Sequence, residues 1–286
     1  MKTQKSNNIV TIFDRDLIAN RLEKTPLTKI DFVSKLVNDD LLERLKLIKR
    51  NFKNAIIIGP IEQNLPNTAN STTDEISFTR FATLRSSNKQ NLLDAENLHF
   101  PKKNYDLIVS LLDLQIVNNV PSYLQNIHKY LAPDGLMISA LIGANSLNEL
   151  RSAWLEAESE IYGGANARIA PFIDIKQAGT LLQHSGFTLP VIDIEHYEIT
   201  YASPLALMKE LKNLSASNPL FERPTKPITK TLLAKAIEKY NKIASNENNR
   251  IRATLDILWL SGWAQHASQQ KPLRPGSAKI SLTKIL

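Results

Sequence analysis

Residues 104–143 constrain the fold most, because two apolar runs flank one helical pattern and the connections between them are short. The first run, YDLIVSLL (105–112), is typical of a buried strand. An amphipathic helix is predicted over 120–131. A tight turn, Pro133-Asp134-Gly135, leads into the second run, LMISALIG (136–143). A strand, a crossover helix and another strand predict two neighbouring parallel strands in an α/β sheet.

The same alternation of strands and helices continues on both sides of this unit. Its elements are predicted as helices over 14–24, 31–50, 146–163 and 174–187, and as strands over 55–58 and 76–82. Two later runs, 190–201 and 277–285, alternate apolar and polar residues, which is typical of partly exposed antiparallel edge strands. We therefore expect an α/β fold with a doubly wound, mostly parallel sheet that is covered by helices on both faces.

The chain is expected to form one domain over 1–286. A helical N-terminal extension (1–54) precedes the core (55–204), and a helical insert (205–264) precedes a final edge strand (265–286). Trp259 and Trp263 are four residues apart, and we interpret them as part of the core. The proline-rich segment PLFERPTKP (219–227) cannot be helical throughout, so it is either a lid edge or a simple connector.

The net charge of +7 is distributed unevenly along the chain. The extension carries a net +5, residues 55–204 carry −7, and residues 205–286 carry +9. The basic residues of both ends alternate with apolar ones at helical spacing, which favours solvated helix faces over a phosphate-binding track. Nucleic-acid binding is therefore not expected, whereas an acidic protein partner is compatible with these charges.

Composition and missing motifs exclude several classes of protein. Cysteine is absent, which removes disulfides, thiolate metal sites and cysteine nucleophiles. No stretch reaches the roughly 18 apolar residues of a membrane span, and the first residues contain no signal-peptide core. Neither a nucleophile elbow nor a phosphate-binding loop motif occurs. We expect a soluble, cytoplasmic protein.

One metal-site pattern deserves a test. His196 and Glu198 would share a strand face, and His266 follows far downstream, which matches the outline of a two-histidine, one-carboxylate iron site. The H-x-E pattern is common by chance, and the remaining histidines have no ligand spacing. The sequence therefore predicts no metal site.

Several blocks of the sequence resemble one enzyme family. NYDLIVSLLDLQIVNNVPSYLQNIHKYLAPDGLMISALIGANSLNELRSAW (104–154) is similar to the centre of class I S-adenosylmethionine-dependent methyltransferases of the biotin-pathway, malonyl-carrier-protein type. The subgroup that contains the methyltransferase-like assembly factor of mitochondrial complex I is more similar still. Four further segments of this chain resemble that subgroup: IFDRDLIANR, PFIDIKQAGTLLQHSGFTLP (171–190), YASPLALMKELKNLSASNPL (201–220) and WLSGWAQHASQQKPLRPGSAKISL (259–282).

The resemblance implies a seven-stranded, Rossmann-like methyltransferase fold that binds S-adenosylmethionine at the carboxyl ends of its first strands. The family's first strand ends in a D-x-G-x-G-x-G motif, whose glycines let the cofactor approach the backbone. This chain has IIIGPIEQN there. Only Gly59 matches; Ile57 replaces the acid, and Pro60, Ile61 and Gln63 replace small residues. The acid that closes the family's second strand is also missing after SFTRFATLRSSN.

The resemblance implies further site residues. Asp94 and Ala95 match the pair that holds the adenine, so the implied cofactor-binding residues are Gly59, Asp94, Ala95 and Leu112. Asp113 and Gln115 stand where the family's substrate meets the cofactor, and are the implied substrate-binding residues. From the residues alone, Gly59 is equally compatible with a strand-ending turn, Asp94 with a helix cap and Asp113 with a solvated loop acid.

The resemblance implies S-adenosylmethionine-dependent methylation of a protein or a carrier-linked substrate. The altered glycine motif keeps an alternative open, a respiratory complex I assembly factor that is either non-catalytic or hydroxylates arginine. The implied partner is a respiratory-complex subunit or another acidic protein. No catalytic base can be named from the sequence.

Overall fold

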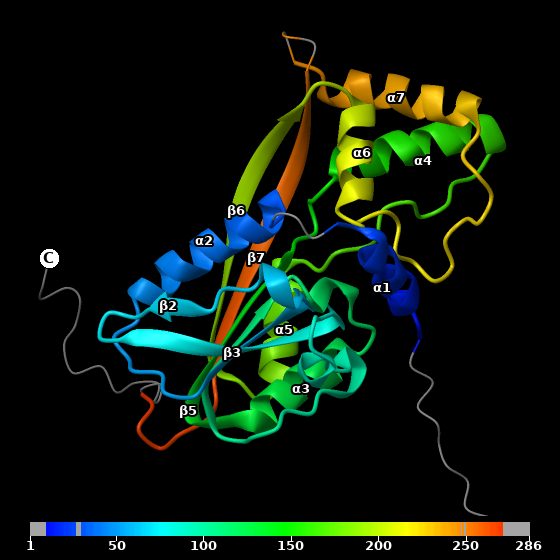
Figure 1. The fold of residues 1–286 in the computed structure, drawn as a ribbon. Coiled ribbons are helices and arrows are strands. Elements are labelled where there is room, and N and C mark those ends of the chain that lie inside the picture. Colours follow the sequence, from blue (N-terminus) through cyan, green and yellow to red (C-terminus); the bar gives the residue numbers. More distant parts are fainter. Residues whose placement is uncertain (1–9, 27–29, 247, 249, 271–286) are drawn as a thin grey trace, which may run out of the picture.

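The computed structural model describes residues 10–26, 30–246, 248 and 250–270, and its centre is a seven-stranded sheet (Figure 1). The strand order is β2-β3-β1-β4-β5-β7-β6. The strands are β1 (Ala55–Ile61), β2 (Thr68–Asn70), β3 (Glu75–Arg85), β4 (Tyr105–Leu111), β5 (Leu131–Ile142), β6 (Thr188–Tyr201) and β7 (Ile251–Trp263). β3, β1, β4 and β5 are parallel, whereas β2, β7 and β6 join antiparallel. The predicted α/β sheet is confirmed, with a parallel centre and antiparallel margins.

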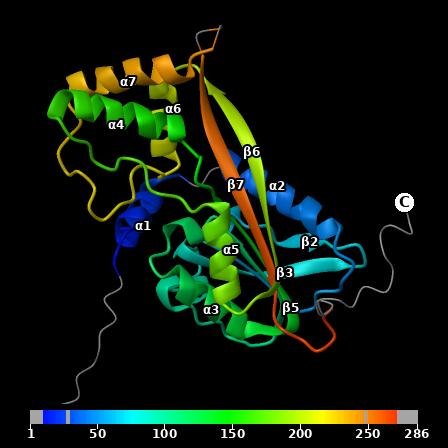
Figure 2. The same ribbon diagram turned by 180° about the vertical axis from the view of Figure 1, so that it is seen from behind.

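Helices cover both faces of the sheet. The helices are α1 (Arg15–Lys24), α2 (Phe32–Lys46), α3 (Val120–Tyr130), α4 (Asn148–Tyr162), α5 (Ile175–His184), α6 (Pro204–Asn213) and α7 (Lys230–Ala244). α3 and α5 lie on one face and α2 on the other (Figures 1 and 2). Successive residues of a strand point to opposite faces. Ile56 and Ile58 therefore pack with α3 and α5, while Ile57 packs with α2.

A separate helical lobe stands at the carboxyl end of the parallel strands. α4, α6 and α7 form their own apolar cluster there, which includes Leu150, Leu207 and Tyr240. The first residues of β7, Ile251 and Ala253, join this cluster. The lobe is thus anchored to the sheet through β7. Among the described residues, every helix is too short or too polar to cross a lipid bilayer.

The range predicted as a helical insert, 205–264, is only partly helical. It holds α6 and α7, but Ile251–Trp263 forms β7, which lies inside the sheet between β5 and β6. Trp259 and Trp263 belong to one strand face, because a spacing of four residues returns to the same side in a strand as well as in a helix. The predicted strand at 277–285 lies outside the described residues.

The connection between the parallel strands β1 and β3 contains no α-helix. It consists of a single 3-10 turn, Glu62–Asn64, followed by the short strand β2. The polar run of this segment has no apolar stripe that could pack a helix against the sheet. This departure from strand–helix–strand alternation comes directly after β1, the strand that contains Gly59.

Candidate functional site

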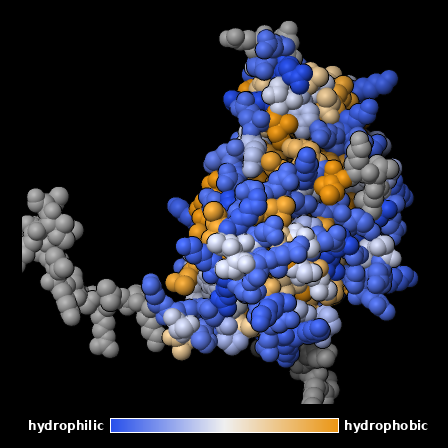
Figure 3. All heavy atoms as spheres, turned by 60° about the vertical axis from the view of Figure 1, so that its left-hand side comes forward, coloured by the Kyte–Doolittle hydropathy of each residue, from blue (hydrophilic) through white to orange (hydrophobic). Residues whose placement is uncertain are grey.

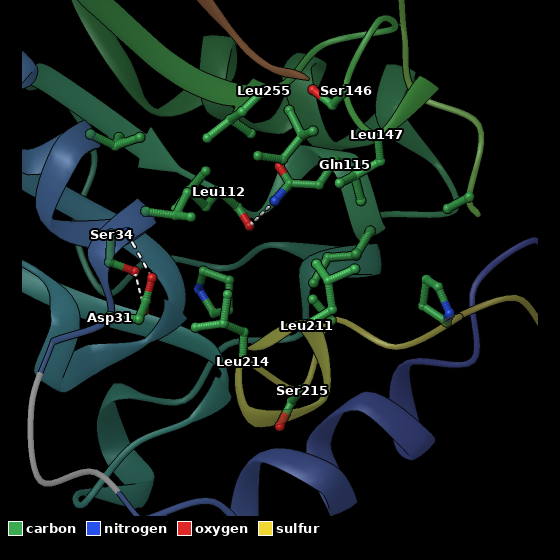
Figure 4. Close-up of a pocket in the computed structure, with 18 of the residues that line it drawn as sticks. Asp31, Ser34, Leu112, Gln115, Ser146, Leu147, Leu211, Leu214, Ser215 and Leu255 are labelled. Carbon is green, nitrogen blue, oxygen red and sulfur yellow. Dashed lines mark hydrogen bonds between the residues drawn. The ribbon is translucent and has the colours of Figure 1, made fainter. Parts of the chain in front are cut away.

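A cavity of about 270 Å³ lies at the carboxyl ends of β1, β3, β4 and β5 (Figure 4). This is the edge of a doubly wound sheet where ligands bind. The sheet supplies Ile61, Leu84, Leu111 and Ile142, and the helical lobe supplies Leu207 and Leu211 on the facing side. The walls are therefore mainly apolar, with few polar side chains among them.

α1 and the segment 214–223 together cover the cavity. The Asp14 amide donates to the Pro219 carbonyl over 2.9 Å, and the Phe221 amide donates to the Ile12 carbonyl over 2.8 Å. The Arg21 guanidinium donates to the Ser217 carbonyl over 2.7 Å. Ile18, Leu22 and Pro219 line the cavity from this cover, and the lid edge and the connector both stay predictions for 219–227.

Three residues of the cavity wall have left-handed backbone conformations that side chains disfavour. Leu112, Leu147 and Ser215 have φ values of 56°, 55° and 58°. Each costs about 1–2 kcal/mol relative to the ordinary conformation. The Leu112 amide is fixed by the Ala140 carbonyl and the Leu147 amide by the Thr254 carbonyl, each over 2.8 Å. The surrounding structure thus enforces the wall's shape, as is common at binding sites.

Asp31 brings a carboxylate into the cavity wall from the start of α2. It is the N-cap of this helix, as its position at the start of the helical pattern predicts, and it accepts the Ser34 amide over 2.8 Å. Its second oxygen accepts the Ser34 hydroxyl over 2.6 Å and the Asn64 amide group over 3.0 Å. These contacts fix the carboxylate without neutralising it, since all three donors are uncharged.

Gln115 provides a second acceptor at the same cavity. Its Nε2 donates to the Leu112 carbonyl over 2.7 Å, which fixes the orientation of the amide (Figure 4). Its Oε1 is buried and has no hydrogen-bond partner. A buried acceptor without a donor costs roughly 1–3 kcal/mol, so a donor-bearing ligand that displaces the atoms covering this oxygen would stabilise it. The structure places Gln115 where a substrate contact was predicted, and that role stays a prediction.

The charged residues that line the cavity favour a ligand that donates hydrogen bonds. Asp31 and Arg168 are its only charged lining residues within the described ranges. Arg168 donates to the buried Glu158 carboxylate over 2.7 Å and lies 4.9 Å from the centre of the Trp154 ring. No cation among the described residues pairs with Asp31. A cationic or donor-rich group therefore suits this cavity better than an anion.

Asp113 lies beneath the cavity rather than in its wall. It is fully buried, accepts the Thr83 hydroxyl over 2.5 Å and lies 3.7 Å from the Arg15 guanidinium. Burial raises the pKa of this carboxyl, although the nearby Arg15 acts in the opposite direction. Its second oxygen has no partner. The solvated loop acid left open by the sequence is therefore wrong, and Asp113 is separated from the cavity where Leu112 and Gln115 lie.

Gly59 serves the packing of the strands. A β-carbon at this position would lie 2.8 Å from Leu65 Cδ2 and 3.0 Å from the Leu111 carbonyl oxygen. Leu65 thus occupies the space beside the glycine backbone, and no α-helix N-terminus follows β1. Pro60 and Ile61, rather than Gly59, line the cavity. Leu65 therefore stands beside the backbone that the family's glycine motif leaves bare, on the wall of the cavity.

The other two cofactor markers are also engaged elsewhere. Arg85 closes β3 where the family has its acid, and its guanidinium donates to the Leu22 carbonyl and, over 2.7 Å, to the Thr25 carbonyl. Asp94 is exposed and caps a 3-10 turn by accepting the Glu96 amide over 2.9 Å, while Ala95 is buried. Neither Asp94 nor Ala95 lines the cavity. The residues present do not fit S-adenosylmethionine in the family's manner.

The two-histidine, one-carboxylate pattern does not assemble. His196 pairs with the Asp256 carboxylate over 2.8 Å, where β6 lies beside the first half of β7. His266 follows the opposite end of β7, beyond Trp263, which pairs with Thr188. No group of three potential metal ligands is present within the described ranges.

This chain is similar to known proteins that include methyltransferases and an arginine-hydroxylase. A family model described as a methyltransferase domain matches residues 39–190. The human mitochondrial arginine-hydroxylase NDUFAF5 is 32% identical over 98% of this chain and 85% of its own length. Malonyl-[acyl-carrier protein] O-methyltransferases are also similar. The enzyme of Halorhodospira halophila is 30% identical over 66% of this chain and 62% of its own length; one from Coxiella burnetii is 25% identical over 90% of each.

Proposed function

This chain belongs to the methyltransferase domain family, and we propose that it recognises an arginine side chain of a respiratory-complex subunit during assembly of that complex. The observation that carries the proposal is a pair of acceptors in a mainly apolar cavity whose one cation is already paired. Asp31 offers a carboxylate without an ion pair among the described residues, and Gln115 offers an unpartnered Oε1. The name of the human relative, an arginine-hydroxylase, supports arginine as the target.

The chemistry of arginine suits this cavity. Its stem of three methylene groups packs well on apolar walls, and its guanidinium presents five N–H donors that need acceptors. A malonyl group would bring a carboxylate next to Asp31, while the one lining cation, Arg168, is already paired with Glu158. Like charges at short distance are unfavourable. A carrier-linked malonyl substrate is therefore supported less well than arginine.

We infer that this chain does not bind S-adenosylmethionine, although its family uses this cofactor in general. Leu65 fills the space beside Gly59, and Arg85 replaces the ribose-binding acid. The role assigned here is therefore recognition and positioning of the arginine, which this chain's own residues can perform. Binding in a water-poor cavity strengthens the charge-assisted hydrogen bonds involved.

We place this role in the cytoplasm, because the cysteine-free composition shows no adaptation to an oxidising compartment. The basic ends of the chain, with net charges of +5 and +9, favour a subunit with an acidic surface around the target arginine. The partner would thus present an arginine to the cavity and acidic residues to the rim.

A peptide titration tests this function. The probes are the peptides Ac-Leu-Arg-Leu-NH2 and Ac-Leu-citrulline-Leu-NH2, which have the same shape but differ in charge. We expect the arginine peptide to bind at least tenfold more tightly, as measured by calorimetry. Asp31→Asn keeps a good N-cap residue and removes the charge, so it should reduce this preference to less than threefold. Equal binding of both peptides by the unmodified chain would overturn the proposal.

The chemical outcome is read from the partner. Mass spectrometry of respiratory complex I from cells with and without this chain shows whether an arginine gains 16 Da or 14 Da. A 16 Da gain that depends on Asp31 would support hydroxylation of the arginine, the activity that the name of the human relative states. An arginine that stays unmodified in cells with this chain, together with failed assembly of the complex in cells without it, supports a non-catalytic role. A 14 Da gain would contradict the inference on S-adenosylmethionine.

A further inference from the structure

A second groove of about 270 Å³ lies on the α2 face of the sheet, away from the cavity described above. It is formed by the C-terminal end of α2, the middle of β5 and the adjoining strands β6 and β7. Its lining includes Leu47, Ile48, Val191, Trp259 and Trp263. Figure 3 is turned so that the α2 and β6 side comes forward, and it shows apolar surface interrupted by polar residues.

Trp259 lies at the floor of this groove. The side chain is 3% exposed, and its indole Nε1 has no hydrogen-bond partner. The Arg44 guanidinium lies over the ring, 4.7 Å from its centre, and fixes the indole in place. A buried N–H group without an acceptor is uncommon in proteins and costs free energy. Because Arg44 covers the ring and the Nε1 atom itself is buried, Trp259 forms a fixed floor of the groove rather than a donor open to a ligand.

The rim of the groove is apolar and open. Leu47 is 81% exposed at the end of α2, and Val191 is 60% exposed on β6. They line the same groove from its two sides. Because each lies beside buried apolar residues of the groove, an incoming apolar side chain could bury both together with its own surface.

The upper rim of the groove carries an excess of negative charge. Arg44 is shared by Asp40, Asp193 and Glu195, whose carboxylate oxygens lie 3.0, 2.7 and 2.9 Å from its nitrogens. One guanidinium cannot neutralise three carboxylates, and Asp193 and Glu195 retain half or nearly half of their side-chain exposure. A basic side chain beside the groove would therefore be attracted.

The outer edge of β6 offers backbone groups next to this groove. β6 is 14 residues long and, within the described ranges, pairs only with β7. Its other side thus presents backbone N–H and C=O groups that an added strand can pair with. Extended peptides bind other proteins in this way, with backbone pairing for affinity and side-chain pockets for specificity.

We propose that this groove and the free edge of β6 bind an extended segment of a partner protein in which an apolar side chain is flanked by lysine or arginine. The apolar side chain packs between Leu47 and Val191, over the floor formed by Trp259. The basic residues lie against Asp193 and Glu195. This surface is independent of the arginine-binding cavity, so its test and that of the proposed function can fail separately.

The test is a titration of the full chain with a fluorescein-labelled peptide, Ac-Lys-Val-Lys-Ile-Lys-Val-NH2, followed by fluorescence anisotropy. The matched control peptide replaces each lysine by glutamate. We expect micromolar binding of the basic peptide and at least tenfold weaker binding of the acidic one. No binding of the basic peptide, or equal binding of the two, overturns the proposal.

Three variants locate the site. Leu47→Ser should weaken binding about tenfold, and Val191→Ser, on the opposite rim, about fivefold. Leu205→Ser, a matched change at an exposed leucine of α6, should leave binding unchanged. If all three variants bind like the unmodified chain, the peptide lies elsewhere and the proposal is wrong. A dimer of the chain that dissociates on Leu47→Ser would show that a second copy occupies the groove, which also overturns it.

Discussion

The two halves of the sheet's carboxyl edge have opposite character. At the ends of β1 and β3, Leu65 covers Gly59, and Arg85 caps α1, so the side chains there satisfy one another. At the ends of β4 and β5, strained residues such as Leu112 border a cavity, and Gln115 keeps an unpartnered oxygen. We call the ends of β1 and β3 the closed half, because side chains stand there in place of the family's glycine motif and ribose-binding acid, although Ile61, Leu65 and Leu84 still border the cavity.

The strongest way to test the closed half is to disturb its packing. Gly59→Ala adds a methyl group 2.8 Å from Leu65 Cδ2 and 3.0 Å from a backbone oxygen, so the free energy of unfolding should fall by about 2–3 kcal/mol. Urea denaturation measures this loss. Gly164→Ala is the matched control, because nothing lies within 4 Å of its added β-carbon. A loss below about 0.5 kcal/mol at Gly59 would show that the space is open to a ligand.

Arg85→Ala removes the contact between the closed half and the cover. The guanidinium donates to the Leu22 and Thr25 carbonyls at the end of α1, so we expect a loss of about 2 kcal/mol. Hydrogen exchange of the α1 amides should accelerate, whereas the exposed neighbour Lys89→Ala should change nothing. Unaltered exchange in α1 would mean that other contacts hold the cover.

Asp113 should make stability depend on pH. Burial raises its pKa above the ordinary value of 3.8, so the unfolded chain loses this proton at a lower pH than the folded chain. The buried carboxyl therefore increasingly favours unfolding as the pH rises above about 4, until the folded chain is ionised as well. Asp113→Asn lacks this titration. The unmodified chain should lose stability relative to the variant between pH 4 and 7, and a gain over that range would contradict the assignment.

Asp94→Ala should have the smallest effect. Its carboxylate caps a 3-10 turn at the surface, so the expected loss of stability is about 0.5 kcal/mol. Affinity for the arginine peptide should stay unchanged, as measured by the same calorimetric titration. A clear loss of affinity would place Asp94 in the binding site and join the two halves that the structure keeps apart.

Much of the fold could be predicted from the sequence, because periodicity reports burial locally. The strand at 105–112 and the helix at 120–131 are confirmed within one residue as β4 and α3. β7 was missed because Trp259 and Trp263 are four residues apart, a spacing that fits one face of a helix and of a strand alike. The predicted helical insert, 205–264, was therefore too long, because it continued past the lysine-rich helix α7 into β7.

The site could be predicted only in part. The resemblance implied Gln115 as a substrate contact; the structure puts it in the cavity wall, and its role stays a prediction. Asp113 comes two positions earlier and is buried beneath it, because Thr83 and Arg15 draw its carboxylate inward. Asp31 was predicted as a helix cap, but its second role depends on α2 lying beside the end of β1, a contact between distant segments. Local patterns carry no signal for such a contact.

One measurement tests the central claim, that the closed half does not hold the cofactor, most directly. The full chain is titrated calorimetrically with S-adenosylmethionine and S-adenosylhomocysteine up to millimolar concentration. The structure predicts no binding heat with either, since Leu65 and Arg85 occupy or close the positions that would hold the ligand. Micromolar binding of either ligand would contradict this account and make methyl transfer the function to pursue.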